Sequence, residues 1–277
     1  MSLKERVLAD LAAAGCAPLH RYGQHFLIDR CALDSLCAAL PLAPGAQVVE
    51  IGPGTGLLTE RLLQHDAHIV AVEIDRGLAA FLARRWAGRK LTVVHGDALR
   101  GAEGLHPAIT AVAAAGPWLF ASNLPYDIAI PAILEAAALP RPPSALAATV
   151  QLACAERLCS RPGDAAWGAS AAILQAAGSP RLLRRVGRAA FHPQPRVDSA
   201  LIAWEPRQPL PPGFAAWVRR VFAYRRKVLI GALRDAGHHP EVARQACAAA
   251  GIAAEHRLEQ LDSSELLALH RALHRAP

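Results

Sequence analysis

The chain has 277 residues, of which 53% are hydrophobic and 19% are charged. This length and composition exclude a disordered protein and allow one large domain with a small second one. The net charge of +7 favours a polyanionic partner such as nucleic acid, although many small proteins are simply basic.

Local signals favour a protein of the cytoplasm. Residues 4–11 mix charged and apolar residues at helical spacing, which predicts an amphipathic helix and argues against a signal peptide. No run of about 18 apolar residues occurs, so we expect no membrane span. The six cysteines form neither a CxxC pair nor a His/Cys ligand spacing, so we expect reduced thiols and no metal.

Residues 46–122 alternate short apolar runs with helical patterns, which predicts βαβ units and a parallel sheet. Buried strands are predicted at 47–51, 68–73, 91–95 and 118–121, with helices between them at 57–64 and 77–86. Further strands are predicted at 146–152, 181–186 and 200–204, where hairpin-like pairing of the last two could close the sheet.

The segment 205–213 is dense in proline, which is incompatible with a strand and predicts a linker. Helical patterns follow from 214 to about 274, interrupted at 237–240 and at Gly251. We therefore expect an α/β domain over residues 1–207, with an N-terminal helical extension, and a small all-α domain over residues 208–277.

The sharpest motif is the loop Glu-Ile-Gly-Pro-Gly-Thr-Gly at 50–56, which follows a predicted strand and precedes a predicted helix. Gly52, Gly54 and Gly56 let the backbone turn tightly and approach a ligand closely. A dinucleotide-binding GxGxxG loop would have its third glycine one residue later, where Leu57 stands. An acidic residue before the loop is a methyltransferase trait, and the Glu50 carboxylate can receive the ammonium end of S-adenosylmethionine.

Acidic residues also follow the next two predicted strands. Glu73 ends the second strand, where a carboxylate can accept from both hydroxyls of a ribose. Asp97, followed by Ala98, comes after the third strand, where it can accept from the adenine amine of a cofactor. Each residue alone would indicate only a strand-end turn, but three acceptors on consecutive strands predict an S-adenosylmethionine site.

The fourth predicted strand leads into Ser-Asn-Leu-Pro-Tyr at 122–126. The amine of an adenine base is a poor nucleophile because its lone pair is delocalised into the ring, and acceptors on its two hydrogens favour a more tetrahedral nitrogen. The side-chain oxygen of Asn123 and the carbonyl of Leu124 can supply these acceptors. Pro125 fixes the turn, and Tyr126 can stack on a flipped-out base. Alone, the motif would indicate a turn with a buried tyrosine.

Several segments together resemble the ribosomal RNA adenine dimethylase family, in the same order along the chain. They are Gly-Gln-His-Phe-Leu at 23–27, the glycine loop, Asn-Leu-Pro-Tyr at 123–126, Phe-His-Pro-Gln-Pro-Arg-Val-Asp-Ser-Ala at 191–200 and Phe-Ala-Tyr-Arg-Arg-Lys at 222–227. The stretch 256–262 resembles the small-subunit branch of that family. The resemblance implies a Rossmann-like class I methyltransferase fold with a mostly parallel sheet and a helical C-terminal domain.

The resemblance also implies an activity and residue roles. The activity is dimethylation, at N6, of two adjacent adenosines near the 3′ end of 16S rRNA, on the small ribosomal subunit during ribosome biogenesis. His25, Leu27, Gly52, Glu73, Asp97 and Asn123 would contact the cofactor. Asn123 to Tyr126 would hold the target adenine, with Phe191 stacked on its other face. No metal is implied, since the methyl sulfonium is already activated and catalysis needs mostly positioning and amine polarisation; a monomer is expected.

Two basic clusters predict phosphate contacts. The first contains Arg181, Arg184, Arg185 and Arg188, and the second contains Arg219, Arg220, Arg225, Arg226 and Lys227 within a helical pattern. The plain alternative for either cluster is a solvated face. The neighbouring aromatic residues Trp217, Phe222 and Tyr224 are expected to pack in a core.

Departures from the family pattern keep alternatives open. Asp127 and Ile130 stand where the family usually has Asn and a small hydroxyl residue, and Leu152 and Ala153 replace a common Lys-Glu pair. A ribosome-assembly or RNA-binding factor that has lost turnover therefore remains an alternative. The others are a large-subunit rRNA adenine methyltransferase of the resistance type, which Leu124 and the long helical tail disfavour, and a small-molecule methyltransferase, which the basic charge disfavours.

Overall fold

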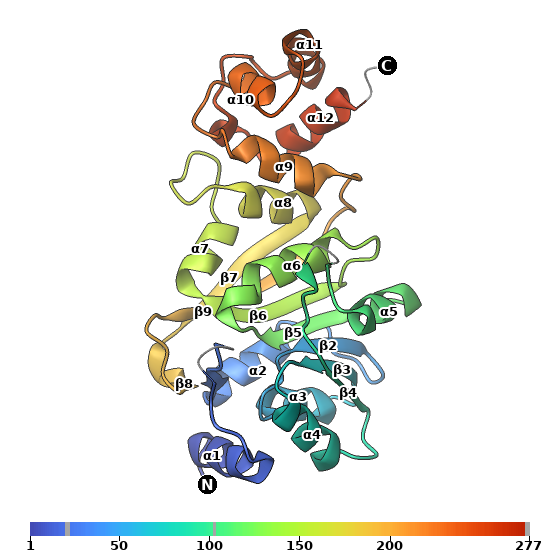
Figure 1. The fold of residues 1–277 in the computed structure, drawn as a ribbon, viewed down its shortest axis with the longest axis vertical. Helices are drawn as coiled ribbons and strands as arrows, with labels where there is room; N and C mark the ends of the chain where they lie inside the picture. The colour runs from blue at the N-terminus through green and yellow to red at the C-terminus, as the bar shows by residue number, and fades with distance from the viewer. Residues whose placement is uncertain (20–22, 102–103, 275–277) are drawn as a thin grey trace. The chain divides into compact units, whose positions relative to one another are not determined.

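The structure is a computed structural model that describes residues 1–19, 23–101 and 104–274 (Figure 1). The chain forms two compact units. The first contains Met1–Ala155 and Arg181–Pro206, and the second contains Glu156–Pro180 and Arg207–Pro277. The second unit therefore takes in a segment that the sequence analysis assigned to the α/β domain. It does so because α8 (Ala169–Ala177) packs against α9 (Phe214–Phe222) and α12 (Ser263–Leu273).

A seven-stranded sheet carries the fold of the first unit. Its order is β4-β3-β2-β5-β6-β9-β7, in which β4 to β6 run parallel and β9 runs antiparallel to β6. The strands of this sheet are β2 (Gln47–Ile51), β3 (His68–Glu73), β4 (Leu91–His95), β5 (Leu119–Asn123), β6 (Ala145–Gln151), β7 (Gly178–Val186) and β9 (Ser199–Pro206). Of these, β2, β3 and β4 match the sequence prediction to the residue.

Helices follow the parallel strands, as the alternating pattern predicts. Asp75, the second residue after β3, caps α4 by accepting from the backbone N–H groups of Gly77 and Leu78 at 2.9 and 3.1 Å. The end of β3 thus turns at once into a helix. The helices associated with the sheet are α1 (Leu3–Ala14), α2 (Arg30–Ala38), α3 (Leu57–Gln64), α4 (Arg76–Arg85), α5 (Pro107–Ala115), α6 (Ala129–Ala138) and α7 (Leu152–Leu158), with short 3₁₀ turns η3 (Tyr126–Ile128) and η4 (Arg188–Ala190).

A two-stranded antiparallel pair lies apart from the main sheet. Strand β1 (Phe26–Leu27) pairs with β8 (Phe191–His192), so that Leu27 faces Phe191 across the pair. Two-residue strands are too short to show a period in the sequence, and we predicted neither of them. The pair brings the 23–27 segment beside the 191–200 segment.

The second unit is helical apart from the start of β7, and two of its helix boundaries, at 236–239 and at Gly251, fall where the sequence analysis expected breaks. Gly251, with a φ of +69°, ends α11 as a left-handed C-cap. Besides α8, α9 and α12, the unit contains α10 (Leu229–Asp235), α11 (Pro240–Ala250) and the 3₁₀ turn η5 (Leu258–Gln260). In the described parts of the chain, no helix is long and apolar enough to cross a membrane.

Two local predictions were wrong. Glu205 and Pro206 belong to β9 and not to a linker. A proline is tolerated at this end of the strand because the pairing of β9 with β6 stops at Trp204, so that the missing N–H of Pro206 breaks no hydrogen bond to β6. Arg225, Arg226 and Lys227 are not helical. Helix α9 ends at Phe222, and the next residues form successive turns in which N–H groups bond three residues back.

Candidate active site

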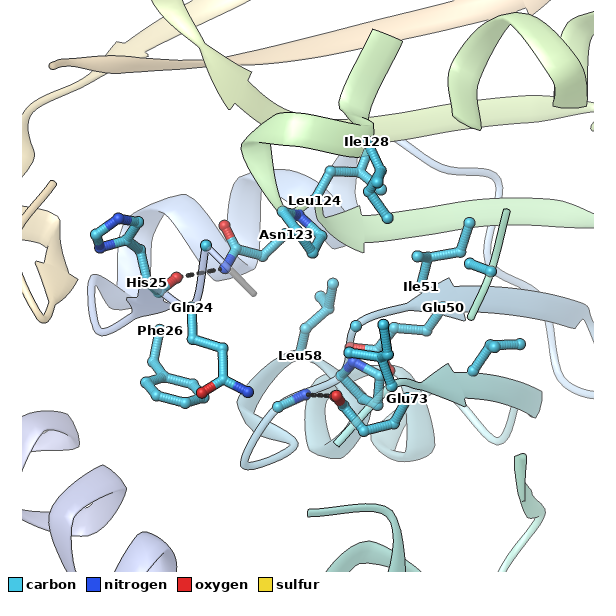
Figure 2. A pocket seen from close by; sticks show the side chains of 18 of the residues that line it. Gln24, His25, Phe26, Glu50, Ile51, Leu58, Glu73, Asn123, Leu124 and Ile128 are labelled. Carbon is cyan, nitrogen blue, oxygen red and sulfur yellow. Dashed lines mark hydrogen bonds between the residues drawn. The ribbon is translucent and has the colours of Figure 1, made fainter. Parts of the chain in front are cut away.

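A pocket opens where β2, β3, β4 and β5 end, which is where open α/β sheets bind ligands (Figure 2). It comprises about 1110 Å³ of space not filled by protein atoms, part of which is open solvent at its mouth. All of its lining residues belong to the first unit. Twelve of the residues predicted for the site line it: His25, Leu27, Glu50, Gly52, Gly54, Glu73, Asp97, Ala98, Asn123, Leu124, Pro125 and Tyr126.

The structure places two predicted site residues elsewhere. Gly56 packs behind the loop, where a built Cβ would lie 2.3 Å from the Trp86 ring. Phe191 is 3% exposed and belongs to the hydrophobic core beneath β1 and β8. In this structure its ring is covered, so its stacking on a base stays a prediction.

The glycine loop packs so closely against neighbouring side chains that little room is left for side chains of its own. Gly52 and Gly54 have φ values of +66° and +60°, in the left-handed region that favours glycine. A Cβ on Gly54 would lie 2.8 Å from the Phe26 ring, and one on Gly52 would lie 3.2 Å from Pro125. The loop is therefore fitted between the 23–27 segment and the 123–126 segment.

Glu73 fastens this loop to the end of β3. Its side chain is 3% exposed, and its two oxygens accept from the N–H of Gly54 and of Asp75, each at 2.9 Å. Burial raises the pKa of Glu73, and the backbone donors oppose that rise. Each oxygen keeps lone pairs for a ligand, so the predicted ribose contact is compatible with this arrangement.

Glu50 is a second buried carboxyl group in the wall of the pocket. It is 1% exposed and accepts from the Thr59 hydroxyl at 2.7 Å. Burial raises its pKa to about 8, and the nearby Glu73 adds to the rise. Among the described residues, no cation pairs with either carboxyl group, which fits a ligand with positive charge. Sequence reasoning missed Thr59, which looked like one polar residue on a helix.

Asn123, the last residue of β5, is held at both ends of its carboxamide. Its Nδ2 donates to the carbonyl of His25 at 2.9 Å, the bond drawn in Figure 2. Its Oδ1 accepts from the hydroxyl of Thr149, a buried residue of β6. One residue earlier, the Ser122 hydroxyl donates to the carbonyl of Ile51 at 2.5 Å, which ties β5 to the start of the glycine loop.

Tyr126 joins three of the motifs that carried the family resemblance. Its ring stacks on His25 with centroids 5.5 Å apart, and its hydroxyl lies 2.7 Å from the Ser199 hydroxyl oxygen. His25 in turn places Nδ1 2.7 Å from the carbonyl oxygen of Pro193. Burial raises the pKa of Tyr126, so the phenol stays protonated at neutral pH.

Two acidic residues of the pocket are exposed. Asp97 is one of them, and it accepts from the Leu99 N–H at 2.9 Å in a strand-end turn. Of the four departures from the family pattern, Asp127 lines the pocket, whereas Ile130, Leu152 and Ala153 do not.

The predicted RNA-binding residues fall in both units. In the first unit, Arg184 donates to the Ser35 hydroxyl at 3.4 Å and Arg185 is exposed. In the second unit, the Arg225 guanidinium donates to the Trp167 carbonyl at 3.1 Å, and Lys227 is paired with Asp235. Arg219, Arg220 and Arg226 are exposed, and Trp217 and Phe222 are buried, as expected for core residues.

The sheet order and the pocket together define a class I methyltransferase fold. Two solved structures share it. A dimethyladenosine transferase from Plasmodium falciparum has a TM-score of 0.71 at 22% identity and covers 88% of this chain and 96% of its own. The 23S rRNA methyltransferase ErmE has a TM-score of 0.65 at 24% identity and covers 90% and 100%.

Sequence comparison then gives the family. Residues 19–274 match the model described as ribosomal RNA adenine dimethylase, and the chain belongs to that family. It is 37% identical over 274 residues to ribosomal RNA small subunit methyltransferase A of Thermobifida fusca, which spans 94% of this chain and 92% of the relative. The protein of the same name from Deinococcus radiodurans is 36% identical over 276 residues, 97% and 90% of the two chains.

Proposed function

We propose that this protein uses S-adenosylmethionine to dimethylate N6 of two adjacent adenosines near the 3′ end of 16S rRNA, on the small ribosomal subunit in the cytoplasm. The relatives named above support the small-subunit substrate. The observation that carries the proposal is a single pocket that combines buried carboxyl groups, a glycine loop and the Asn-Leu-Pro-Tyr motif.

The residues of the pocket suit the cofactor by charge and by space. Glu50 would receive the ammonium group, and the loop at Gly52 and Gly54 would let the backbone come close. Glu73 would accept from the ribose, and Asp97 from the adenine amine. When bound, S-adenosylmethionine supplies a methyl group on a positively charged sulfur, which needs no further activation.

The target adenine would be held by residues of the 123–126 motif. The Asn123 Oδ1 and the Leu124 carbonyl would accept the two amine hydrogens, which orients the nitrogen lone pair. The Tyr126 ring would support the base, since its hydroxyl is anchored at Ser199. The proton released from the amine can pass to water, so no residue is nominated as a general base.

The test measures transfer of labelled methyl groups from S-adenosylmethionine to unmethylated small ribosomal subunits. Large subunits and free nucleosides serve as competing acceptors. We expect label in the small-subunit RNA alone. Label in the large-subunit RNA would favour the resistance-type activity, and label only in nucleosides would favour a small-molecule methyltransferase.

Asn123→Ala tests the proposed chemistry. We expect transfer to fall at least 100-fold, because the amine loses one of its two preorganised acceptors. Cofactor affinity, measured by calorimetry, should stay within several-fold because Glu50 and the glycine loop are unchanged. Near-normal turnover would remove Asn123 from the proposed mechanism.

A further inference from the structure

Thr149 lies directly opposite Asn123, on the neighbouring strand of the sheet. Strands β5 and β6 are parallel, and their register pairs Asn123 with Thr149. The Thr149 side chain is 1% exposed, so bulk water does not compete for its hydroxyl. The residue lies just outside the pocket wall and was not singled out by any sequence motif.

Thr149 contacts the two residues, Asn123 and Leu124, whose oxygens would accept from the target amine. Its hydroxyl donates to Oδ1 of Asn123, and its carbonyl accepts from the N–H of Leu124 at 3.2 Å. One residue of β6 therefore fixes the Asn123 carboxamide and also the peptide unit that leads to the Leu124 carbonyl.

The two partners of Asn123 constrain its carboxamide in complementary ways. The His25 carbonyl accepts from Nδ2, and it would face another acceptor if the carboxamide were reversed. The Thr149 hydroxyl holds the oxygen end and prevents that end from swinging. A carboxamide oxygen has two lone pairs, so Oδ1 keeps one for a ligand.

We propose that Thr149 is a positioning residue for methyl transfer: its hydroxyl orients the Asn123 oxygen that accepts from the target amine. This proposal rests on the proposed function, in which Asn123 polarises that amine. Preorganised acceptors raise the rate of the chemical step, whereas the cofactor would be held mainly by Glu50, Glu73 and the glycine loop. The loss of the hydroxyl should therefore appear in kcat and not in cofactor affinity.

The decisive variant is Thr149→Val, which keeps the β-branched shape and removes the hydroxyl. We expect kcat for small-subunit methylation to fall about tenfold, the loss that corresponds to one hydrogen bond. The KM for S-adenosylmethionine and its calorimetric Kd should stay within about threefold. Thr149→Ser restores the hydroxyl and should recover most of the wild-type kcat.

Thr59→Val is the matched control, since it removes another buried hydroxyl from a pocket carboxyl group, Glu50. It should weaken cofactor binding more than it lowers the kcat at saturating cofactor. A purely structural role for Thr149 would lower thermal stability, cofactor affinity and kcat together. That result, or a wild-type kcat in Thr149→Val, would overturn the proposal.

A second measurement does not depend on methyl transfer, and Thr149→Ala can replace Thr149→Val if the valine variant does not fold. In ¹⁵N-asparagine-labelled protein, the side-chain amide signal of Asn123 is identified by its loss in Asn123→Ala. We expect it to shift and exchange faster with solvent in Thr149→Val or Thr149→Ala, and to stay near its wild-type position in Thr149→Ser. An unchanged signal in both hydroxyl-free variants would contradict the proposal. An inactive wild type with this pattern would overturn the proposed function but leave the role of Thr149 in orienting Asn123 in place.

Discussion

At the residue scale, the site depends on small groups that only the fold brings together. Gly54 and Phe26 lie far apart in the chain, but a Cβ on the glycine would lie 2.8 Å from the aromatic ring. Asn123 and Thr149 meet only because β5 and β6 pair in one register. Residue identity could thus predict that Asn123 belongs to the site, but the partner that orients it requires the three-dimensional pairing.

Gly56 and Gly45 have nearly the same φ value, +83° and +81°. Replacing each by alanine therefore separates the cost of backbone strain from the cost of a steric clash. A Cβ on Gly56 would lie 2.3 Å from Trp86, whereas one on Gly45 would have nothing within 4 Å. Gly45→Ala should cost about 1 kcal/mol of unfolding free energy, for backbone strain alone. Gly56→Ala should cost about 2–3 kcal/mol more, because the half-buried Trp86 ring must move. Urea unfolding measures both, and equal costs would contradict the packing described here.

Glu50 should make the stability of the protein depend on pH. Its pKa is raised by burial from 4.5 to about 8, so between these pH values the folded chain holds a proton that the unfolded chain has lost. The unfolding free energy should therefore fall as pH rises through that range, by up to about 1.4 kcal/mol per pH unit. Urea unfolding at pH 5, 6.5 and 8 tests this.

Glu50→Gln should flatten this dependence, and its stability relative to wild type should rise with pH. Glu73 also has a raised pKa, so part of the slope should remain. If the unfolding free energies of wild type and Glu50→Gln change with pH in parallel, the pKa of Glu50 is not raised in the folded protein.

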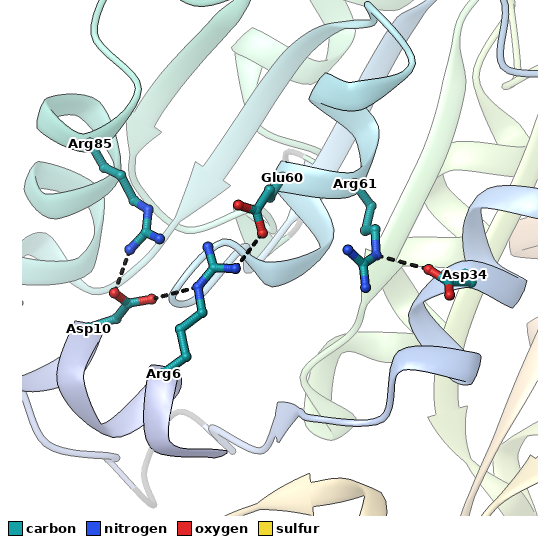
Figure 3. A network of polar contacts seen from close by, with 6 residues as sticks. All are labelled: Arg6, Asp10, Asp34, Glu60, Arg61 and Arg85. Atoms are coloured by element: carbon teal, nitrogen blue, oxygen red, sulfur yellow. Dashed lines mark hydrogen bonds and ion pairs between the residues drawn. The ribbon is translucent and has the colours of Figure 1, made fainter. Parts of the chain in front are cut away.

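At the element scale, α1 is attached to helices α3 and α4 by an ion-pair network (Figure 3). Arg6 of α1 contacts Glu60 of α3 at 2.6 Å, and Asp10 of α1 is paired with Arg85 of α4 and lies 3.8 Å from Arg6. Asp10 is 8% exposed. The helix precedes the pocket-lining residues 23–27 in the chain.

Asp10→Asn should loosen α1, because two guanidinium groups lose their shared carboxylate. We expect a loss of about 1–3 kcal/mol in unfolding free energy, between the values for exposed and buried pairs. Amide hydrogen exchange in α1 should speed up, and cofactor affinity should fall a few-fold. Asp34→Asn is the control, since the Asp34 side chain is 63% exposed in its pair with Arg61. It should change stability by less than about 0.5 kcal/mol, and equal effects of the two variants would contradict an anchoring role for Asp10.

The elements that could be predicted are those with a long, regular pattern. Strands β2, β3 and β4 and helix α3 agree with the sequence prediction to the residue, because apolar periodicity and the glycine loop mark their ends. The β1–β8 pair, the turn after α9 and the grouping of residues 156–180 with the C-terminal helices depend on distant contacts. No local pattern encodes them.

At the scale of the whole molecule, the chain is basic, with a net charge of +7 and a pI near 9.5. The two compact units both carry exposed arginines, which suits an extended polyanion. The charge does not distinguish a specific RNA site from general attraction. To make that distinction, an exposed arginine inside a predicted RNA-binding cluster and one outside it must be substituted separately.

Arg226→Glu is such a test. Arg226 is exposed, whereas the neighbouring Arg225 holds the Trp167 carbonyl and its reversal would disturb the fold. We expect Arg226→Glu to weaken small-subunit binding several-fold and to reduce its salt dependence, with cofactor affinity unchanged. Arg84→Glu makes the same change of charge at an exposed position of α4, and it should have a clearly smaller effect. If both variants weaken binding equally, the effect is one of total charge.

The most direct measurement maps the product of the reaction. Purified protein is incubated with S-adenosylmethionine and unmethylated small ribosomal subunits, and the RNA is digested and analysed by mass spectrometry. The account predicts N6-dimethyladenosine at two adjacent positions near the 3′ end of 16S rRNA. If the cofactor binds but no methylated adenosine forms, the protein is an assembly or RNA-binding factor, and the exposed Asp127 at the pocket becomes the first residue to revert to Asn.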